Sequence, residues 1–404
     1  MKSYDVIIIG GGASGMACAV AALRKNPKLR LAVLEKNDRL GKKLLSTGNG
    51  RCNLTHANIS SERYVGSFKA QSGKVFKRCD TDYILSFFSS LGLMTTCDGE
   101  GRYYPLSRQA SSVLDVLRFG CEKAGADIIC GVQINSLKKS ERGFTVATRD
   151  ESYTSEKLVL ACGSKASPKL GGSASGLDYL RNLGVKTAPF YPALCPLTVN
   201  DAVIKSLKGI RTACKITLLG GNGEIKRVEE GELQFAENAL SGICVFNLSL
   251  YAQIGDKVAV DLFPDISDKE LYSSLKEAKE LFSELTSDNL FTGKLHKRLG
   301  QAVLKLSGVK DFSRLCSELG DREIVKITDT AKAMSFSVGG FGGFDQAQCA
   351  KGGAVGAEID ERTMRVKRVS GLYLCGEAVD ICGECGGYNL HFAFASGIIA
   401  GESL

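Results

Sequence analysis

The stretch that decides the fold is YDVIIIGGGASG, residues 4–15. Its first half is a continuous apolar run rich in β-branched residues, typical of a strand buried on both faces of a parallel sheet. Beyond the glycines, residues 16–25 are rich in alanine and contain no Gly or Pro, so they predict a helix that ends near Pro27. A second apolar run, residues 29–34, ends at Glu35. The sequence therefore predicts a strand, a glycine turn, a helix and a second strand closed by an acid.

The spacing of the glycines fits a turn that binds a dinucleotide. Gly10 allows a tight turn after the strand, Gly12 lets a pyrophosphate approach the backbone, and Gly15 allows close packing of helix and strand. The helix N-terminus offers N–H groups and the positive end of its dipole to the phosphates. Glu35 lies about 20 residues beyond the last glycine, where an acid accepts a ribose 2′-hydroxyl and disfavours a 2′-phosphate. We therefore expect FAD or NAD, not NADP, at this turn.

Composition narrows the class of protein. A chain of 404 residues, 44% hydrophobic and 24% charged, is typical of a globular protein of two or three domains. No apolar stretch is long enough for a membrane span, and the first strand leaves no room for a signal peptide, so we expect a cytoplasmic protein without a membrane partner. The net charge of +8 comes without a dense basic block interleaved with aromatics, so a nucleic-acid partner is not expected. The 15 scattered cysteines are expected to be reduced, most of them in the core.

Changes in pattern along the chain predict three parts. Residues 190–265 hold β-rich runs separated by turns, residues 268–329 are helical and charged, and strand-like runs resume afterwards. We predict an α/β fold with a Rossmann-like domain made of residues 1–190 and 331–404. It is split by an inserted β-rich domain, residues 191–267, and a small helical subdomain, residues 268–330. No internal repeat and no signal for an oligomeric state is evident.

Residues 36–55 are too rich in glycine and polar side chains to predict a regular element. The segment carries Lys42, Lys43 and Arg51 and follows directly on the first two strands. We interpret it as a loop that lies along the dinucleotide, the alternative being a flexible solvated loop.

Several motifs together resemble one known family. They are IIIGGGASGMACA (7–19), VLEK (33–36), GKKLLSTGNGRCNLT (41–55), GRYYPLSRQAS (101–111), VLACGS (159–164) and GLYLCGEAVDICGECGGYNLHFAFASG (371–397). On these motifs the chain resembles the BaiN-like and aminoacetone oxidase family of FAD-dependent oxidoreductases. The RCN and GGYNL segments are more specific than the N-terminal glycines. The resemblance implies tightly bound FAD in a domain built from both ends of the chain.

The resemblance also implies which residues bind FAD. It places the phosphates at Gly10, Gly12, Ala13, Ser14 and Gly15, and the adenosine ribose at Glu35. The second flavin loop is implied at Lys36, Lys43, Asn49, Gly50, Arg51, Cys52 and Asn53, and the adenine contact at Val132. The strand-end turn is implied at Ala161 and Gly163, and the ribityl contact at Gly376 and Glu377. The isoalloxazine contact is implied at Gly387, Tyr388, Asn389 and Leu390. A helix beginning near Asn389 would also direct its positive end at the flavin N1 and O2, unless it only packs.

Candidate reactive groups cluster near the C-terminus. We expect Tyr388 and His391 to position or protonate the substrate, although a lone histidine such as His391 or His56 is more often a packing residue. Cys382 and Cys385 form a CxxC pair, interpreted as incidental thiols, with a redox dithiol as the alternative. No second CxxC or nearby histidine completes a zinc set, so no metal is expected. There is no second GxGxxG, so NAD(P)H is expected to dock transiently on the flavin.

These expectations leave several functions open. The first is an FAD-dependent oxidoreductase that moves a hydride between flavin and a small organic substrate. It is either an NAD(P)H-linked reductase of an enone, such as a 3-oxo steroid or bile acid, or an oxygen-using oxidase of a small amine such as aminoacetone. The second is a tRNA-modifying flavoprotein. The third is a redox sensor in which the CxxC pair reports the flavin state.

Overall fold

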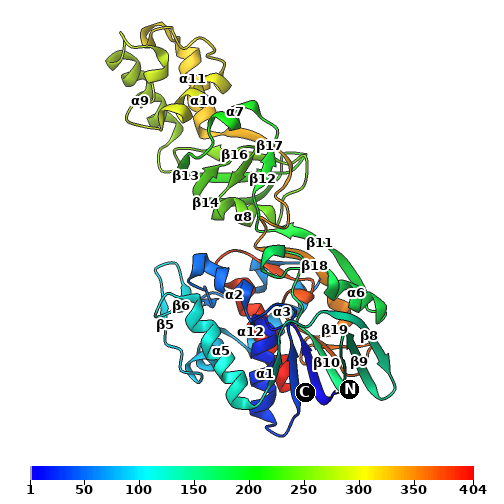
Figure 1. The fold of residues 1–404 in the computed structure, drawn as a ribbon. Coiled ribbons are helices and arrows are strands. Elements are labelled where there is room, and N and C mark those ends of the chain that lie inside the picture. Colours follow the sequence, from blue (N-terminus) through cyan, green and yellow to red (C-terminus); the bar gives the residue numbers. More distant parts are fainter. Residues whose placement is uncertain (1) are drawn as a thin grey trace. The chain divides into compact units, whose positions relative to one another are not determined.

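The protein, seen in a computed structural model that describes residues 2–404, divides into two compact units. Unit 1 comprises Met1–Ala193 and Phe344–Leu404, and unit 2 comprises Leu194–Gly343. In Figure 1 the red C-terminal segment lies together with the blue N-terminal segment inside unit 1. Unit 1 is therefore assembled from both ends of the chain.

Unit 1 is built on a nine-stranded sheet. Its strands are β1 (Lys2–Ile9), β2 (Leu31–Leu34), β7 (Asp127–Ile129), β8 (Ile134–Ser140), β9 (Gly143–Thr148), β10 (Ser152–Leu160), β19 (Ile359–Asp360), β20 (Arg365–Val366) and β21 (Leu372–Leu374). The order β21-β10-β1-β2-β7 is parallel, with Ile8 of β1 opposite Val159 of β10 and Val33 of β2. The other strands join in antiparallel pairs. The parallel centre confirms the predicted Rossmann-like α/β fold.

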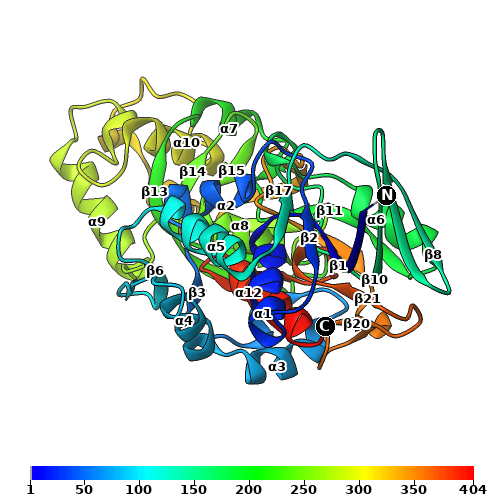
Figure 2. The same cartoon turned by 60° about the horizontal axis from the view of Figure 1, so that its bottom comes forward.

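Three helices of unit 1 lie against each other, with α1 (Ala13–Lys25) contacting both α5 (Ala110–Ala124) and α12 (Tyr388–Glu402) (Figure 2). A Cβ on Gly397 would lie 2.3 Å from the Ser14 carbonyl oxygen, and one on Gly401 would lie 2.3 Å from that of Cys18. Both contacts advance by four residues along both helices, so α1 and α12 run parallel. Only glycine at these positions lets the two backbones approach so closely.

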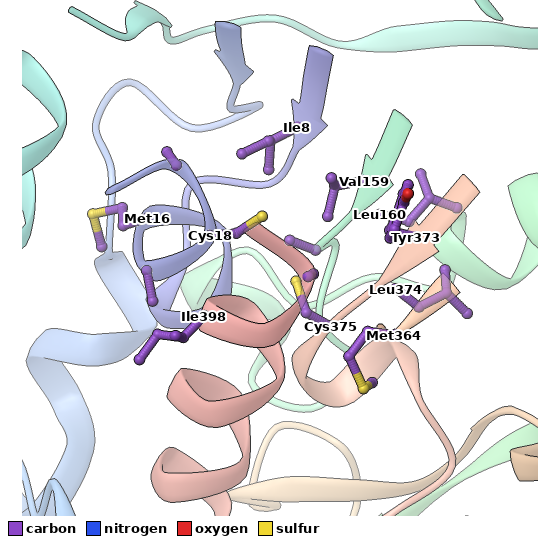
Figure 3. Packing of buried hydrophobic residues seen from close by; sticks show 14 of the residues in the cluster. Ile8, Met16, Cys18, Val159, Leu160, Met364, Tyr373, Leu374, Cys375 and Ile398 are labelled. Carbon is purple, nitrogen blue, oxygen red and sulfur yellow. The ribbon is translucent and has the colours of Figure 1, made fainter. Parts of the chain in front are cut away.

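The core of unit 1 lies between these helices and the sheet (Figure 3). Cys18 of α1, Ile398 of α12 and Ile8, Val159 and Leu374 of the sheet belong to this one cluster, and each of these side chains is buried. Burial of this apolar surface holds the first and last segments of the chain together, which sets where α1 and α12 begin.

Smaller elements complete unit 1. A small three-stranded sheet contains β3 (Thr55–His56), β6 (Arg102–Pro105) and β5 (Thr95–Cys97). Two further two-stranded sheets pair β4 (Tyr64–Val65) with β22 (Cys382–Gly383) and β11 (Thr187–Ala193) with β18 (Cys349–Ala354). The helices are α2 (Lys42–Ser46), α3 (Lys69–Arg78), α4 (Thr81–Ser89) and α6 (Ser175–Asn182). The short α2 lies where we expected no regular element. It begins after Gly41, whose left-handed backbone (φ 68°) turns the chain into the helix.

Unit 2 is a closed six-stranded barrel with helices. Its strands, in order around the barrel, are β12 (Leu197–Val199), β15 (Ala239–Ser241), β14 (Ile225–Phe235), β13 (Arg211–Leu219), β16 (Lys257–Asp261) and β17 (Met334–Phe341). Its helices are α7 (Ala202–Ser206), α8 (Ile243–Ser249), α9 (Asp268–Leu281), α10 (Lys297–Ser307) and α11 (Asp321–Lys332). Barrel and helices share one buried cluster that includes Ile216, Val258, Leu271 and Leu299.

The last barrel strand differs from the sequence expectation. β17 pairs with β12 and β16 and so closes the barrel, although it follows the helices in sequence and falls in the segment we assigned to the Rossmann-like domain. Closure satisfies backbone groups on strands that are distant along the chain, which no local pattern reports. None of residues 2–404 belongs to a helix long and apolar enough to cross a membrane.

Candidate functional site

The glycine turn between β1 and α1 has the geometry of a phosphate-binding turn. Gly10 has φ 110°, and a Cβ there would lie 2.3 Å from the Ala161 carbonyl oxygen. A Cβ on Gly15 would lie 2.0 Å from the Gly10 carbonyl oxygen. Gly12 differs: it begins α1, no side chain caps the helix there, and nothing lies within 4 Å of a Cβ at this position. The space beside Gly12 at the start of α1 is therefore open, and among residues 2–404 no side chain satisfies the first N–H groups of the helix.

The carboxylate of Glu35, at the end of β2, is buried and held by backbone groups. Its Oε2 accepts from the Gly11 N–H at 2.8 Å, and its Oε1 accepts from the Asn37 N–H at 2.8 Å and from the Asn37 side-chain amide at 2.7 Å. A carboxylate has about four lone-pair positions, so one remains for a ligand hydroxyl. The Val132 N–H donates to the Glu35 carbonyl, which places Val132 beside the acid.

Lys43 and Glu377 form an ion pair between segments far apart in the sequence. The Lys43 Nζ lies 2.9 Å and 2.7 Å from the two Glu377 carboxylate oxygens, and the Ser164 hydroxyl donates to Oε2 at 2.8 Å. Burial alone would raise the pKa of Glu377, but the Lys43 ammonium and these hydrogen bonds hold it below its usual value. Burial likewise opposes the charge of Lys43, and Glu377 outweighs it and raises the Lys43 pKa. Both groups are therefore charged at neutral pH.

One cavity of about 130 Å³ joins these features. Nine of the residues we expected to bind FAD line it: Gly10, Gly12, Glu35, Lys36, Lys43, Val132, Ala161, Gly163 and Glu377.

A second group of expected residues gathers at the N-terminus of α12, and we call Asn53, His56, Gly387 and Tyr388 the α12 cluster. Gly387 has φ 101°, and a Cβ there would lie 2.7 Å from the Asn53 Oδ1. That Oδ1 is buried and has no hydrogen-bond partner in the protein. The His56 ring stacks on the Tyr388 ring at 5.0 Å, and no side chain caps α12. The cluster thus combines an orphaned acceptor with an uncapped helix end.

The two uncapped helix ends point the same way and are offset along parallel axes. Gly397 of α12 lies against Ser14 at the start of α1, and α12 begins nine residues earlier, at Tyr388. Because Ser14 is the second residue of α1, the two starts are offset by eight residues, which is about 12 Å at 1.5 Å per residue. Open space at Gly12, a buried acceptor at Glu35 and the orphaned Asn53 Oδ1 beside the second helix end fit a long ligand with a diphosphate and a polar ring. The residues present therefore fit FAD.

Comparison with known proteins also indicates an FAD-dependent protein. The HI0933-like protein Rossmann domain family matches residues 4–403. The chain belongs to this family of FAD-dependent oxidoreductases. The family resemblance inferred from the motifs is thereby confirmed, as is the class of enzyme.

Members of known activity match along the whole chain. A 3-dehydro-bile acid delta(4,6)-reductase of Clostridium scindens is 35% identical over 402 residues, which cover 98% of each chain. A ribosomal RNA dihydrouridine synthase of Escherichia coli is 28% identical over 405 residues, covering 100% of this chain and 98% of that one. The structure of a 3-ketosteroid-delta4-(5alpha)-dehydrogenase from Rhodococcus jostii RHA1 aligns with a TM-score of 0.52 at 14% identity, over 100% of this chain and 96% of that one, which shows the shared fold.

The remaining residues expected to bind FAD in this family member are placed around both ends of the site. Residues 48–50 and 52 all have left-handed backbones, so the loop bends sharply beside α2. Cys52 within it is fully buried, and burial raises its pKa to about 12. Ser14 and Gly376 meet at the start of α1, where a Cβ on Gly376 would lie 2.6 Å from the Ser14 hydroxyl. Ala13 and Leu390 lie in the first turns of α1 and α12.

Two expected contacts use their side chains in another way. The Asn389 side-chain amide hydrogen-bonds to the N–H and carbonyl of Gly383, at 2.8 Å and 2.7 Å, and so holds the preceding turn. The Arg51 guanidinium lies 5.6 Å from the centre of the Tyr104 ring, and its Nε donates to the Gly48 carbonyl. Asn389 therefore offers a ligand less than its motif suggested, whereas Arg51 engages only its Nε, and Asn49 and Gly50 offer exposed backbone.

His391 differs from the expected proton donor. It is fully buried, with Nδ1 2.7 Å from the Thr55 hydroxyl and Nε2 3.0 Å from the Cys79 carbonyl oxygen. Because a carbonyl only accepts, the proton of the neutral ring is assigned to Nε2. Burial lowers the pKa of His391 to about 4, so the ring is neutral at physiological pH. Both nitrogens are occupied, which gives His391 a structural role.

His56 keeps a more open environment. It is half-buried, its Nδ1 accepts from the Asn58 N–H at 3.0 Å, and burial lowers its pKa below the usual value. The stack on Tyr388 makes it part of the α12 cluster. The CxxC pair is divided: Cys382 is buried in β22, and Cys385 is half-buried in the turn that follows. A sensor role for this pair stays a prediction.

Sequence reasoning missed four contributors: Asn37, Tyr104, Arg108 and Ser164. Asn37 and Ser164 lie three and four residues beyond the ends of β2 and β10, so their position near these strand ends was a usable signal. Tyr104 and Arg108 lie in the motif 101–111, but nothing local marks which side chains of that motif meet residues 48–53.

Proposed function

We propose that the protein reduces a carbon–carbon double bond conjugated to a carbonyl, with electrons that NAD(P)H delivers to FAD, and that its substrate is a 3-oxo steroid or bile acid. The Clostridium scindens relative, 35% identical over nearly the whole chain, is by name a delta(4,6)-reductase of a 3-dehydro-bile acid. The E. coli relative makes dihydrouridine, which is uridine with its C5–C6 double bond reduced. That bond is also conjugated to a carbonyl, so one bond chemistry covers both relatives.

The observation that carries the proposal is the pair of parallel, uncapped helix ends offset by about 12 Å. FAD would supply hydride transfer to and from its ring. The start of α1, with Gly12, would bind the diphosphate, and the Glu35 carboxylate would accept from the ribose. The start of α12 favours negative charge on the group beside it, which promotes acceptance of a hydride there.

The chain must also supply or guide one proton, because enone reduction adds a hydride to one carbon and a proton to the other. The two ring nitrogens of His391 are both occupied, so it is a poor donor. Tyr388 remains the candidate at the ring end, and the His56 ring stacked on it holds its orientation. The Tyr64 hydroxyl donates to the Tyr388 carbonyl at 2.7 Å and fixes the first residue of α12.

The test is anaerobic mixing of the FAD-loaded protein with NADH or NADPH while flavin absorbance is followed. A reductase is bleached rapidly without organic substrate and regains its colour when a 3-oxo-4-ene steroid is added. An amine oxidase stays yellow with either nicotinamide and bleaches with aminoacetone instead. If NADH or NADPH bleaches the flavin but no enone restores its absorbance, the steroid substrate is refuted, while reduction of the flavin by nicotinamide stands.

A second candidate is reduction of a uracil in ribosomal RNA. The E. coli relative that does this spans 100% of this chain. Unit 1 carries 33 Lys and Arg against 24 Asp and Glu, whereas unit 2 carries 19 against 20, so the positive surplus belongs to the unit with the flavin site. Positive surplus there favours a polyanionic partner. Incubation of unmodified ribosomal RNA with the FAD-loaded protein and NADPH, followed by nucleoside mass spectrometry, tests this; dihydrouridine formation would establish it.

A further inference from the structure

Two arginines flank one aromatic ring beside the α12 cluster. The Arg51 guanidinium lies 5.6 Å, and the Arg108 guanidinium 4.7 Å, from the centre of the Tyr104 ring. Two like charges are thus held within about 10 Å of each other. The Tyr104 ring is buried on β6 and gives both guanidiniums a common surface to stack on.

Neither charge is neutralised by the protein. Among residues 2–404 no carboxylate lies within ion-pair distance of Arg51 or Arg108. Arg51 is exposed and Arg108 is half-buried. Guanidinium groups bind carboxylates and phosphates through paired hydrogen bonds, so an unneutralised pair around one ring is suited to an oxyanion.

The backbone that carries the pair is held in an uncommon conformation. Arg108 has φ 55°, and on either side of Arg51 the residues Asn49 and Cys52 have φ 55° and 58°. A left-handed backbone at residues other than glycine persists only where the surrounding structure imposes it. The two arginines are therefore fixed in place by their segments rather than carried on flexible loops.

The pair lies next to the proposed ring end of the flavin site. A Cβ on Gly48 would lie 3.7 Å from the Tyr104 ring and 3.2 Å from the Asn53 N–H nitrogen. Asn53 in turn meets Gly387, where a Cβ would lie 2.7 Å from its Oδ1. Gly48 and Asn53 thus connect the ring between the arginines to the start of α12.

The strand pair that precedes Arg108 in the chain is flanked by two exposed apolar side chains. Met94 is 71% exposed and Leu106 is 54% exposed, and the Leu106 N–H donates to the Met94 carbonyl at 2.8 Å. Exposed apolar side chains beside two arginines fit an amphipathic anion better than a nucleic-acid strand, which needs a broader basic surface with exposed rings for stacking. Tyr104 itself is buried and cannot stack on a base.

We propose that Arg51 and Arg108 bind the side-chain carboxylate of a steroid acid whose enone ring reaches the α12 cluster. This assignment rests on the proposed function and adds the substrate's second anchor. Its probes are a 3-oxo-4-ene steroid acid and the methyl ester of the same compound, which removes the charge and keeps the rings.

The experiment measures KM for both probes with the FAD-loaded protein. A charged hydrogen bond contributes enough that Arg108→Ala should raise the ratio of KM for the acid to KM for the ester about tenfold or more. Arg51→Ala should act in the same direction, and Arg108→Lys should restore part of the ratio. The matched control is Arg142→Ala, an exposed arginine in the turn between β8 and β9, which removes the same charge and leaves the ratio unchanged.

The outcomes separate this inference from the proposed function. Turnover of both probes with an unchanged ratio in Arg108→Ala overturns the carboxylate site and keeps the function. If neither probe is turned over, the steroid function fails, and calorimetric binding of the acid then decides the site. Binding weakened about tenfold or more by Arg108→Ala supports it; absent or unaffected binding overturns it. Arg108-dependent binding of a uridine oligonucleotide without binding of the acid also overturns it, in favour of RNA.

Discussion

Gly12→Ala should separate FAD binding from folding. Gly12 has φ −83° and ψ −170°, which any residue can adopt, and nothing lies within 4 Å of a Cβ there. The new methyl group would occupy the space in front of α1 that the diphosphate needs. Forcing an extra carbon into a filled site costs about 1–3 kcal/mol. We therefore expect FAD affinity to fall by about 5- to 150-fold, while the unfolding free energy without FAD changes by less than about 1 kcal/mol.

Gly15→Ala provides the contrast. A Cβ there would lie 2.0 Å from the Gly10 carbonyl oxygen and 3.3 Å from the Ala161 Cβ, so the helix must move away from the strand. This variant should lose stability with or without FAD. Fluorescence titration of the apoprotein with FAD and urea unfolding of the apoprotein measure the two quantities separately. Wild-type FAD affinity in Gly12→Ala, or wild-type stability in Gly15→Ala, would refute the assignment of the turn.

Three further predictions concern groups that only the fold brings together. The pKa of His391 is about 4 in the folded protein and about 6.5 in the unfolded chain, so between these pH values only the unfolded chain binds the extra proton. The free energy of unfolding should therefore fall by about 3 kcal/mol as the pH falls from above 6.5 to 4. Urea unfolding as a function of pH should show a smaller decrease in His391→Gln. Lys43→Met should destabilise more than the double variant Lys43→Met/Glu377→Gln, because the single variant strands a carboxylate; a double-mutant cycle by urea unfolding measures the coupling. Gly397→Val should push α12 away from Ser14 and lower the melting temperature, whereas the same change at the exposed Gly221 should have little effect in a thermal scan.

Local features of the fold could be predicted from sequence. The apolar run at residues 6–9, the glycine spacing and the acid at Glu35 lie within one strand–helix–strand unit, and neighbours in sequence determine that unit. The start of α12 was predicted at Asn389 and lies at Tyr388, because Gly386 and Gly387 mark the break before it. These are features that periodicity and glycine report directly.

Features set by distant segments could not be predicted. The strand β17 closes the barrel by pairing with β12 and β16, and its own sequence does not indicate which strands it pairs with. The barrel and the helices that follow it looked like separate parts, yet they share one core. Hydrophobic periodicity shows which face is buried, and it carries no information about what covers that face.

By itself the sequence determined that this chain has a strand–glycine turn–helix–strand unit closed by an acid, and a second glycine-led helix near its end. Only the tertiary structure decided that α1 and α12 run parallel with their starts offset by about 12 Å along the axes, that His391 has both nitrogens occupied, and that Arg51 and Arg108 meet at one ring. The physical reason is separation along the chain: Lys43 and Glu377 are 334 residues apart, and packing of the two glycine-lined helices brings such groups together.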